Sequence, residues 1–263
     1  MSIANSPIGI FDSGIGGTSI WKEIKKALPN ENTIYLSDSS NAPYGPKGKD
    51  KIIELAVKNT ELLLSEGCKL IVVACNTATT NAISYLRKKH GIPFIGIEPA
   101  IKPASLRTKT GIVGILATKG TLNSELFAKT SSSLERQIKI IEQVGTGLVE
   151  LIENGKINTS EMSHLLESYV QPLLSQNADC LVLGCTHYPY LIPQIRKIVG
   201  SDFQIIDSGE AVARQTKNIL KKYHLENPSE ETGIHQFFIN INKQVLEQFV
   251  HSSAIISIKE LDF

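Results

Sequence analysis

The chain has 263 residues, of which 41% are hydrophobic and 20% are charged, as in an ordinary globular protein that buries its own core. The 27 basic and 26 acidic residues leave a net charge of +1, so the chain lacks the strongly positive field on which non-specific nucleic-acid binding depends. We therefore expect one large or two small domains and no nucleic-acid partner.

The N-terminal stretch Met1–Pro7 contains no basic segment followed by an apolar run, so no signal peptide is expected. No window approaches ~18 consecutive apolar residues, so no contact with a membrane is expected either. These features predict a cytoplasmic protein whose four cysteines stay reduced.

Short apolar runs rich in Val, Ile and Leu alternate along the chain with longer amphipathic stretches. The runs show no polar–apolar alternation, which is typical of parallel strands covered on both faces. The predicted strands, in chain order, are Ile8–Phe11, Thr33–Leu36, Leu70–Ala74, Phe94–Ile97, Gly111–Leu116, Ile138–Ile141, Leu181–Gly184, Phe203–Ile206 and Gln236–Ile239. The predicted helices between them include Asp50–Glu66, Thr77–His90, Ser160–Gln176 and Gly209–Tyr223. This order predicts an α/β fold with parallel sheets.

An internal repeat relates the two halves of the chain. The segment Leu63–Cys75 returns as Leu173–Cys185 at an offset of 110, with Leu-Leu-Ser at the start and Cys at the end of both copies. Upstream, Ile10–Ser13 resembles Ile115–Thr118 at an offset of 105, which requires one five-residue insertion. We therefore predict two pseudo-symmetric parallel-sheet α/β domains. They comprise residues 1–97 plus 209–263, and residues 98–208.

The segments that follow the predicted strands form the candidate site, because ligands of open parallel sheets bind beyond the carboxyl ends of the strands. These segments carry small polar groups, a carboxylate, an imidazole and two thiols. They are Asp12–Gly17, Ser37–Gly45, Cys75–Thr77, Ala117–Thr118 and Cys185–His187. They contain no dense cluster of metal ligands, so no metal is expected.

The glycine-rich turn Gly14-Ile15-Gly16-Gly17 raises the question of a dinucleotide site. The dinucleotide fingerprint requires a third glycine where Ser19 stands, so a nucleotide is not favoured. The turn still leaves backbone N–H groups free at the start of a helix, which suits an anion. We expect a carboxylate to bind there as readily as a phosphate.

The four cysteines do not form a zinc site if the predicted strands are correct. Cys68 and Cys75 bracket one strand and would lie about 23 Å apart, and Cys180 and Cys185 about 16 Å apart. Four thiolates around zinc must each lie ~2.3 Å from the metal, and a disulfide needs still closer partners. Cys68 and Cys180 are therefore interpreted as small buried apolar residues.

Cys75 and Cys185 align in the repeat, and both follow a strand at the predicted ligand-binding edge. Each precedes a predicted helix start, which lowers the pKa of a thiol. Racemisation at a carbon needs two acid/base groups on opposite faces of Cα, and two facing domains can supply one each. The pair therefore favours a racemase in which one sulfur is a thiolate and the other a thiol. The alternative is two ordinary buried thiols in a duplicated core.

Four blocks of this sequence resemble the signature blocks of bacterial glutamate racemases. They are Phe11–Thr18, Ala42–Gly45, Ala74–Ala78 and Gly184–Pro189, in the expected order in a chain of the expected length. The resemblance implies two α/β domains with the active site in the cleft between them, no cofactor and no metal. It also implies a homodimer that supplies D-glutamate for peptidoglycan synthesis.

The resemblance also implies roles for individual residues. Cys75 would act on D-glutamate and Cys185 on L-glutamate, and Asp12 and His187 would assist them. The residues implied to bind substrate are Asp12, Ser13, Tyr44, Gly45, Asn76, Thr77, Thr118, Thr186 and His187. A glutamate near the middle of the chain takes part in some members, and Glu150 is the candidate, with Glu153 close by.

Several alternatives remain open at this point. The residues alone do not separate glutamate from aspartate, so an aspartate racemase or a related cysteine-pair racemase is the alternative. Asp12 suits a substrate ammonium, but it also suits a helix cap. His187 suits either a partner for Cys185 or a satisfied core histidine. A pyridoxal-phosphate enzyme would need Lys119 as its Schiff base, and a two-lobed binding protein would need no thiols at all.

Overall fold

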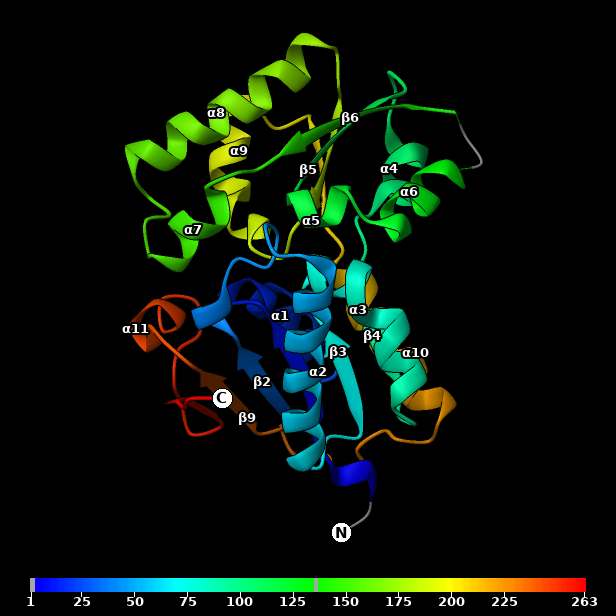
Figure 1. Ribbon diagram of the computed structural model, residues 1–263, viewed down its shortest axis with the longest axis vertical. Helices are drawn as coiled ribbons and strands as arrows, with labels where there is room; N and C mark the ends of the chain where they lie inside the picture. The colour runs from blue at the N-terminus through cyan, green and yellow to red at the C-terminus, as the bar shows by residue number, and fades with distance from the viewer. Residues whose placement is uncertain (1–2, 135–136) are drawn as a thin grey trace.

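The computed structural model describes residues 3–134 and 137–263. Residues 1–2 and 135–136 fall within the N-terminal stretch and the domains predicted above, and lie outside the described residues. The molecule has two lobes, each built on one sheet (Figure 1). The first lobe contains the first and last parts of the described chain, coloured blue to cyan and orange to red, and the second lobe contains the green-to-yellow middle.

The first lobe holds a six-stranded sheet in the order β10-β9-β2-β1-β3-β4, with every pair parallel. Its strands are β1 (Ile8–Asp12), β2 (Thr33–Ser37), β3 (Leu70–Val73), β4 (Phe94–Gly96), β9 (His235–Ile239) and β10 (Ile256–Glu260). Its α-helices are α1 (Thr18–Ala27), α2 (Lys49–Ser65), α3 (Asn76–Lys89), α10 (Gly209–Lys222) and α11 (Lys243–Leu246). Its short 3₁₀ helices are η1 (Ile3–Asn5), η2 (Ile15–Gly17) and η3 (Ser39–Asn41).

The second lobe holds a four-stranded parallel sheet in the order β6-β5-β7-β8. Its strands are β5 (Ile112–Ala117), β6 (Lys139–Val144), β7 (Cys180–Gly184) and β8 (Gln204–Ile206). Its helices are α4 (Ile101–Arg107), α5 (Lys119–Leu122), α6 (Glu125–Ser132), α7 (Leu148–Glu153), α8 (Ser160–Ser175), η4 (Tyr188–Leu191) and α9 (Ile192–Val199).

The two sheets repeat one pattern of strands, since β2-β1-β3-β4 of the first corresponds to β6-β5-β7-β8 of the second. The register repeats as well: Ile8 pairs with Leu70, and Val113 pairs with Cys180. These equivalent pairs are related by the offsets of 105 and 110 found in the sequence. The predicted fold class, with its two pseudo-symmetric parallel-sheet units, is confirmed.

Every predicted strand is present with small shifts at its ends, and so are the four predicted helices. The strand β10 was not predicted. It lies at the edge of the first sheet, and its burial pattern is mixed, with only Ile258 buried. An edge strand of this kind lacks the continuous apolar run by which the inner strands were recognised.

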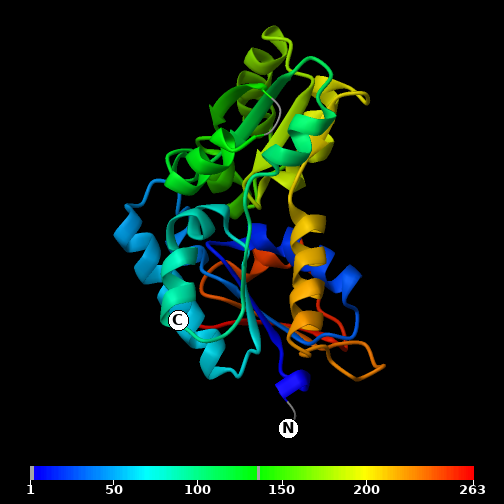
Figure 2. The same ribbon diagram turned by 90° about the vertical axis from the view of Figure 1, so that its right-hand side faces the viewer.

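Each inner strand packs against helices on both sides, as β1 illustrates. Ile8 and Ile10 join the apolar cluster that includes residues of α1 and α10, while Phe11 joins the cluster with residues of α2 and α3. Figure 2 shows the orange helix α10 on one side of the first lobe and the cyan helices on the other. Each of these buried side chains contributes about 1.5–3 kcal/mol to folding. The sheet edge that carries the site is therefore rigidly supported.

The chain crosses between the lobes twice, before α4 and before α10. The two crossings are tied together where the Ser208 hydroxyl donates to the carbonyl of Glu98 at 2.6 Å. The division into residues 1–97 plus 209–263 and 98–208 remains a prediction about domain boundaries.

Among the described residues, no helix is both long enough and apolar enough to cross a bilayer.

Candidate active site

A small cavity lies between the lobes, where the carboxyl ends of the two sheets face each other. Its volume is about 10 Å³, room for about one water molecule. Its walls are Ser13, Pro43, Tyr44, Gly45, Cys75, Asn76, Thr77, Thr118, Val149, Cys185, Thr186 and His187. The structure thus brings both aligned cysteines and nearly all predicted substrate-binding residues to one place. Pro43 and Val149 were not predicted as site residues.

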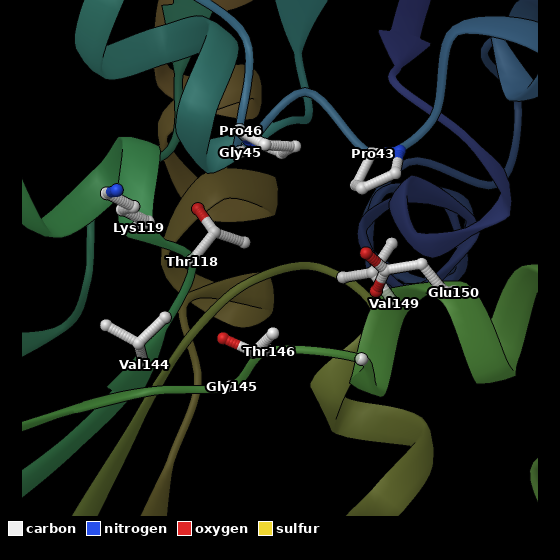
Figure 3. A pocket seen from close by; sticks show the side chains of 11 residues that line it. Pro43, Gly45, Pro46, Thr118, Lys119, Val144, Gly145, Thr146, Val149 and Glu150 are labelled. Atoms are coloured by element: carbon white, nitrogen blue, oxygen red, sulfur yellow. The ribbon is translucent and has the colours of Figure 1, made fainter.

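A larger pocket of about 310 Å³, here called the vestibule, adjoins this cavity (Figure 3). The two spaces share Pro43, Gly45, Thr118 and Val149 as lining residues. Ligand pockets commonly measure about 300–1,000 Å³, so the vestibule has the size of a ligand site and the inner cavity does not. A ligand can therefore reach the thiols only if the two lobes move apart or if the loop that carries Pro43 moves away from the cavity.

Cys75 lies at the N-cap of α3, where its Sγ accepts the backbone N–H of Ala78 at 3.4 Å. The thiol donates to the Ser13 hydroxyl at 3.6 Å. Burial and the neighbouring Asp12 carboxylate nevertheless raise the pKa of Cys75 well above its usual value, and these two hydrogen bonds oppose the rise only in part. The expectation of a lowered pKa is wrong for this thiol, because desolvation outweighs the helix N-terminus.

Asp12 does not line the cavity, but it forms hydrogen bonds with a residue on each side of it. It is fully buried, and its two carboxylate oxygens accept from Ser13 Oγ at 3.0 Å and from Thr186 Oγ1 at 2.7 Å. Burial raises the pKa of Asp12, while His187 and the Thr186 hydroxyl act against this rise. Neither η2 nor α1 has a side-chain cap, so the capping role considered for Asp12 is not the one it performs.

Cys185 is not at the start of an α-helix, because a 3₁₀ helix begins at Tyr188 and α9 begins only at Ile192. Its Sγ instead lies 3.7 Å from Nδ1 of His187. Nε2 of the same imidazole lies 2.6 Å from Oε1 of Glu153. Burial lowers the pKa of His187, but the hydrogen bonds with Cys185 and Glu153 raise it more, to well above its usual value. His187 is therefore a hydrogen-bonded partner of Cys185 and Glu153 rather than an isolated core histidine.

The glycine-rich turn does bind a carboxylate, but one from the protein itself. The N–H of Ile15 donates to Oε1 of Glu153, from the opposite lobe, at 2.7 Å. A Cβ at Gly14 would lie 1.9 Å from the same oxygen, and one at Gly16 would lie 2.2 Å from Nδ1 of His187. The anion site expected for a ligand is thus occupied by Glu153, and the glycines allow its close approach.

Glu150 and Glu153 both lie on α7, but in different surroundings. Glu150 is exposed and lines the vestibule, whereas Glu153 is buried against His187. The structure therefore does not bring Glu150 to the thiols, and Glu153 is the glutamate that joins the site. The two positions are one helical turn apart, a difference that the sequence pattern did not resolve.

The remaining polar groups of the cavity include one unpartnered amide. Asn76 is 2% exposed, and among the described residues neither its Oδ1 nor its Nδ2 has a hydrogen-bond partner. Burying an amide without partners is unfavourable, which points to a ligand that supplies them. Nearby, Thr77 Oγ1 and Thr118 Oγ1 lie 2.7 Å apart across the two lobes. Tyr44 is held by a hydrogen bond from its hydroxyl to Asp38.

The other cysteines and Lys119 lie away from the inner cavity. Cys68 and Cys180 are buried and free, and burial raises the pKa of Cys68 to about 12 and of Cys180 to about 11. Their interpretation as buried apolar residues is confirmed. Lys119 is exposed on α5, at the wall of the vestibule.

Comparison with known proteins gives consistent results. The family described as Asp/Glu/hydantoin racemase matches residues 8–216. A glutamate racemase of Herpetosiphon aurantiacus is 44% identical over 229 residues, which cover 87% of this chain and 90% of the relative. The structure of a glutamate racemase isoform from Bacillus anthracis superposes with a TM-score of 0.87 at 31% identity, covering 98% of both chains. That of a Francisella tularensis glutamate racemase in complex with D-glutamate gives 0.83 at 29% identity, covering 97% of this chain and 98% of the other.

Proposed function

This chain belongs to the Asp/Glu/hydantoin racemase family, and we propose that it interconverts L- and D-glutamate by proton transfer between Cα and two thiols, Cys75 and Cys185. Its function as a glutamate racemase is supported by relatives of that name over most of the chain and by matching structures. The assignment of the chemistry to particular residues is the part that we propose.

One observation carries the assignment: the two thiols enter one cavity from opposite lobes, and each has its own chain of proton-bearing groups. Cys75 is followed by Ser13 and Asp12, and Cys185 is followed by His187 and Glu153. General acid/base catalysis needs such a group within reach of the proton to be moved. Two of them on opposite sides meet the requirement of racemisation.

In the direction from L-glutamate, the Cys185 thiolate removes the proton from Cα and becomes a thiol. The electron pair left on Cα then takes a proton from the Cys75 thiol on the opposite face, which gives D-glutamate and leaves Cys75 as a thiolate. Solvent returns the two sulfurs to their starting protonation states. The reverse reaction exchanges the roles of the two thiols.

The electrostatics of the cavity suit this chemistry. The raised pKa of His187 favours a proton beside the Cys185 sulfur, and the raised pKa of Cys75 favours its thiol form, which together match the starting state for L-glutamate. Once Cys75 is a thiolate, its raised pKa makes it a stronger base. The same shift makes the Cys75 thiolate rarer at neutral pH, so a higher pKa does not by itself make it a better catalyst.

Substrate recognition is proposed for the polar groups that line the cavity. The unpartnered Asn76 amide would bind a carboxylate or the ammonium group, and the hydroxyls of Thr77, Thr118 and Thr186 would add donors. Ser13, Tyr44, Gly45 and His187 complete the proposed binding set. These groups perform the reaction without a cofactor or a metal.

Solvent exchange tests the proposal directly. In D₂O, wild-type protein should incorporate deuterium at Cα of both enantiomers, whereas Cys75→Ala and Cys185→Ala should not racemise glutamate at an appreciable rate. Cys68→Ala and Cys180→Ala are matched controls, since they remove buried thiols outside the cavity, and both should retain activity. Turnover close to that of wild type in either Cys75→Ala or Cys185→Ala would refute the two-thiol mechanism.

The alternative of an aspartate racemase is tested in the same assay with aspartate as substrate, and we expect a clear preference for glutamate.

The D-glutamate formed would supply peptidoglycan synthesis, and a strain that lacks the protein should grow only with added D-glutamate. A cytoplasmic location and assembly as a homodimer are further parts of the proposal, and sedimentation analysis tests the assembly.

A further inference from the structure

Ser39 lies behind the catalytic groups, in the loop that follows β2, and it does not line the cavity. It is 6% exposed, and its hydroxyl donates to Oε2 of Glu153 at 2.8 Å. Oε1 of the same carboxylate is engaged by the N–H of Ile15 and by His187. Among the described residues, Ser39 is thus the hydrogen-bond partner of Oε2, the Glu153 oxygen that does not contact His187.

The direction of these hydrogen bonds follows from the donors available. An ionised carboxylate only accepts, so the single proton of the Ser39 hydroxyl points to Glu153. The Ser37 hydroxyl lies 3.0 Å from that of Ser39 and must therefore donate to it. The result is a directed chain from the end of β2 through both serines to Glu153. Such chains strengthen each of their bonds.

We propose that Ser39 is a positioning residue for the reaction at Cys185. By holding Oε2 from the first lobe, it fixes the carboxylate of Glu153 in the orientation that places Oε1 against His187, which in turn contacts Cys185. The inference rests on the proposed two-thiol racemase. It assigns a function to a hydroxyl that touches neither the cavity nor a thiol.

The proposal has an asymmetric consequence, because the chain through Ser39 serves only one of the two thiols. Cys75 depends on Ser13 and Asp12 instead. Glu153 affects the pKa of His187, Asp12 and Tyr35, and the hydroxyl of Tyr35 donates to the carbonyl of Gly14. Loss of Ser39 should therefore slow the proton transfer at Cys185 more than that at Cys75.

Isotope effects reveal this asymmetry, whereas rates alone do not. The two enantiomers of glutamate have equal free energies, so kcat/KM is the same in both directions for any variant. With α-deuterated L-glutamate, the deuteron is removed at Cys185, and with α-deuterated D-glutamate it is removed at Cys75. If the Cys185 step becomes slower, the first isotope effect on kcat/KM rises and the second falls.

The experiment compares wild type with Ser39→Ala and Ser39→Thr. We expect Ser39→Ala to lower kcat/KM about ten-fold, as for loss of one hydrogen bond to a charged group. Its isotope effect should rise for L-glutamate and fall for D-glutamate. Ser39→Thr keeps the hydroxyl and should restore both values, and Ser37→Ala should shift them in the same directions by less. Ser105→Ala, a buried serine on α4 that donates to the Lys102 carbonyl, should leave them unchanged.

Isotope effects in Ser39→Ala that are unchanged, or that shift in the same direction for both enantiomers, would overturn the assignment, because a general loosening of the fold gives no such asymmetry. This result is distinct from failure of the proposed function. In that case the wild-type protein itself would show no deuterium incorporation at Cα of either enantiomer.

Discussion

The substitution Glu153→Gln tests the electrostatics of the site most directly, because it keeps the shape of the side chain and removes its charge. In the structure the carboxylate accepts from the N–H of Ile15 at 2.7 Å and from Ser39 at 2.8 Å, and lies 2.6 Å from Nε2 of His187. A glutamine oxygen can still accept from Ile15. It carries no charge, so it no longer favours a proton on His187 as the carboxylate does.

A hydrogen bond to a charged group contributes roughly 1.5–3 kcal/mol, which corresponds to a fall in kcat/KM of roughly 10- to 150-fold. The free energy of unfolding should fall by about 2 kcal/mol, because the Ser39 hydroxyl must also reorient. The pKa of His187 should fall, since Glu153 is one of the groups that raise it. The alkaline limb of the pH–rate profile should therefore shift to lower pH.

The matched control is Glu150→Gln, the same change one turn away on α7, at an exposed position on the vestibule wall. Racemisation followed by circular dichroism gives kcat/KM, and urea unfolding with an unchanged m-value gives the loss of stability. Glu150→Gln should change both quantities little. The reasoning is refuted if Glu150→Gln loses as much activity as Glu153→Gln, or if Glu153→Gln retains the wild-type rate.

Three further predictions follow from buried groups. The Glu31 carboxylate lies 2.6 Å from Nζ of Lys69, and both side chains are buried. Lys69→Met removes the positive charge of this pair, so it should lower the free energy of unfolding by about 3–5 kcal/mol in urea titrations. Burial lowers the pKa of His235 to about 4, so the unfolded chain binds a proton there that the folded protein does not. Stability should fall as pH drops from about 6.5 to about 4, and His235→Gln should reduce this dependence in urea titrations at pH 7 and pH 5. Gly14→Ala should abolish most racemisation, because its Cβ would lie 1.9 Å from the Glu153 carboxylate, although its backbone φ of −170° suits any residue.

Two of these predictions, those for Lys69 and Gly14, have a control in the same molecule. Lys51→Met removes an exposed ion pair with Glu54, and should change stability by less than about 1 kcal/mol. Gly48→Ala adds a Cβ with no atom within 4 Å, and should leave activity unchanged. A Lys69→Met protein as stable as wild type, an unaltered pH dependence in His235→Gln, or an active Gly14→Ala protein would each contradict the corresponding argument.

The inner strands and the identity of the two thiols could be predicted because their signals are local. A buried parallel strand is a short apolar run, and the residue that follows it lies at the ligand-binding edge. The strand ends therefore predict that Cys75 and Cys185 lie at ligand-binding edges, and the repeat predicts that the two edges are equivalent. The same criterion failed for β10, since only Ile258 of this edge strand is buried.

The pKa of Cys75 could not be predicted in this way. Its position at a helix start is a local feature, and that feature lowers the pKa of a thiol. Burial is a property of the closed arrangement of both lobes, and for this thiol it is the larger effect. The sign of the shift was therefore decided by packing rather than by neighbours in the sequence.

By itself, the sequence determined the α/β class, the internal duplication, and the pair of thiols with the polar residues beside them, because each is visible in short runs of consecutive residues. Only the tertiary structure decided which glutamate supports His187 and what fills the glycine-rich turn. Ile15 and Glu153 are 138 residues apart, and Ser39 and Glu153 are 114 apart. Contacts of this kind depend on how the two sheets meet, and no local pattern encodes that geometry.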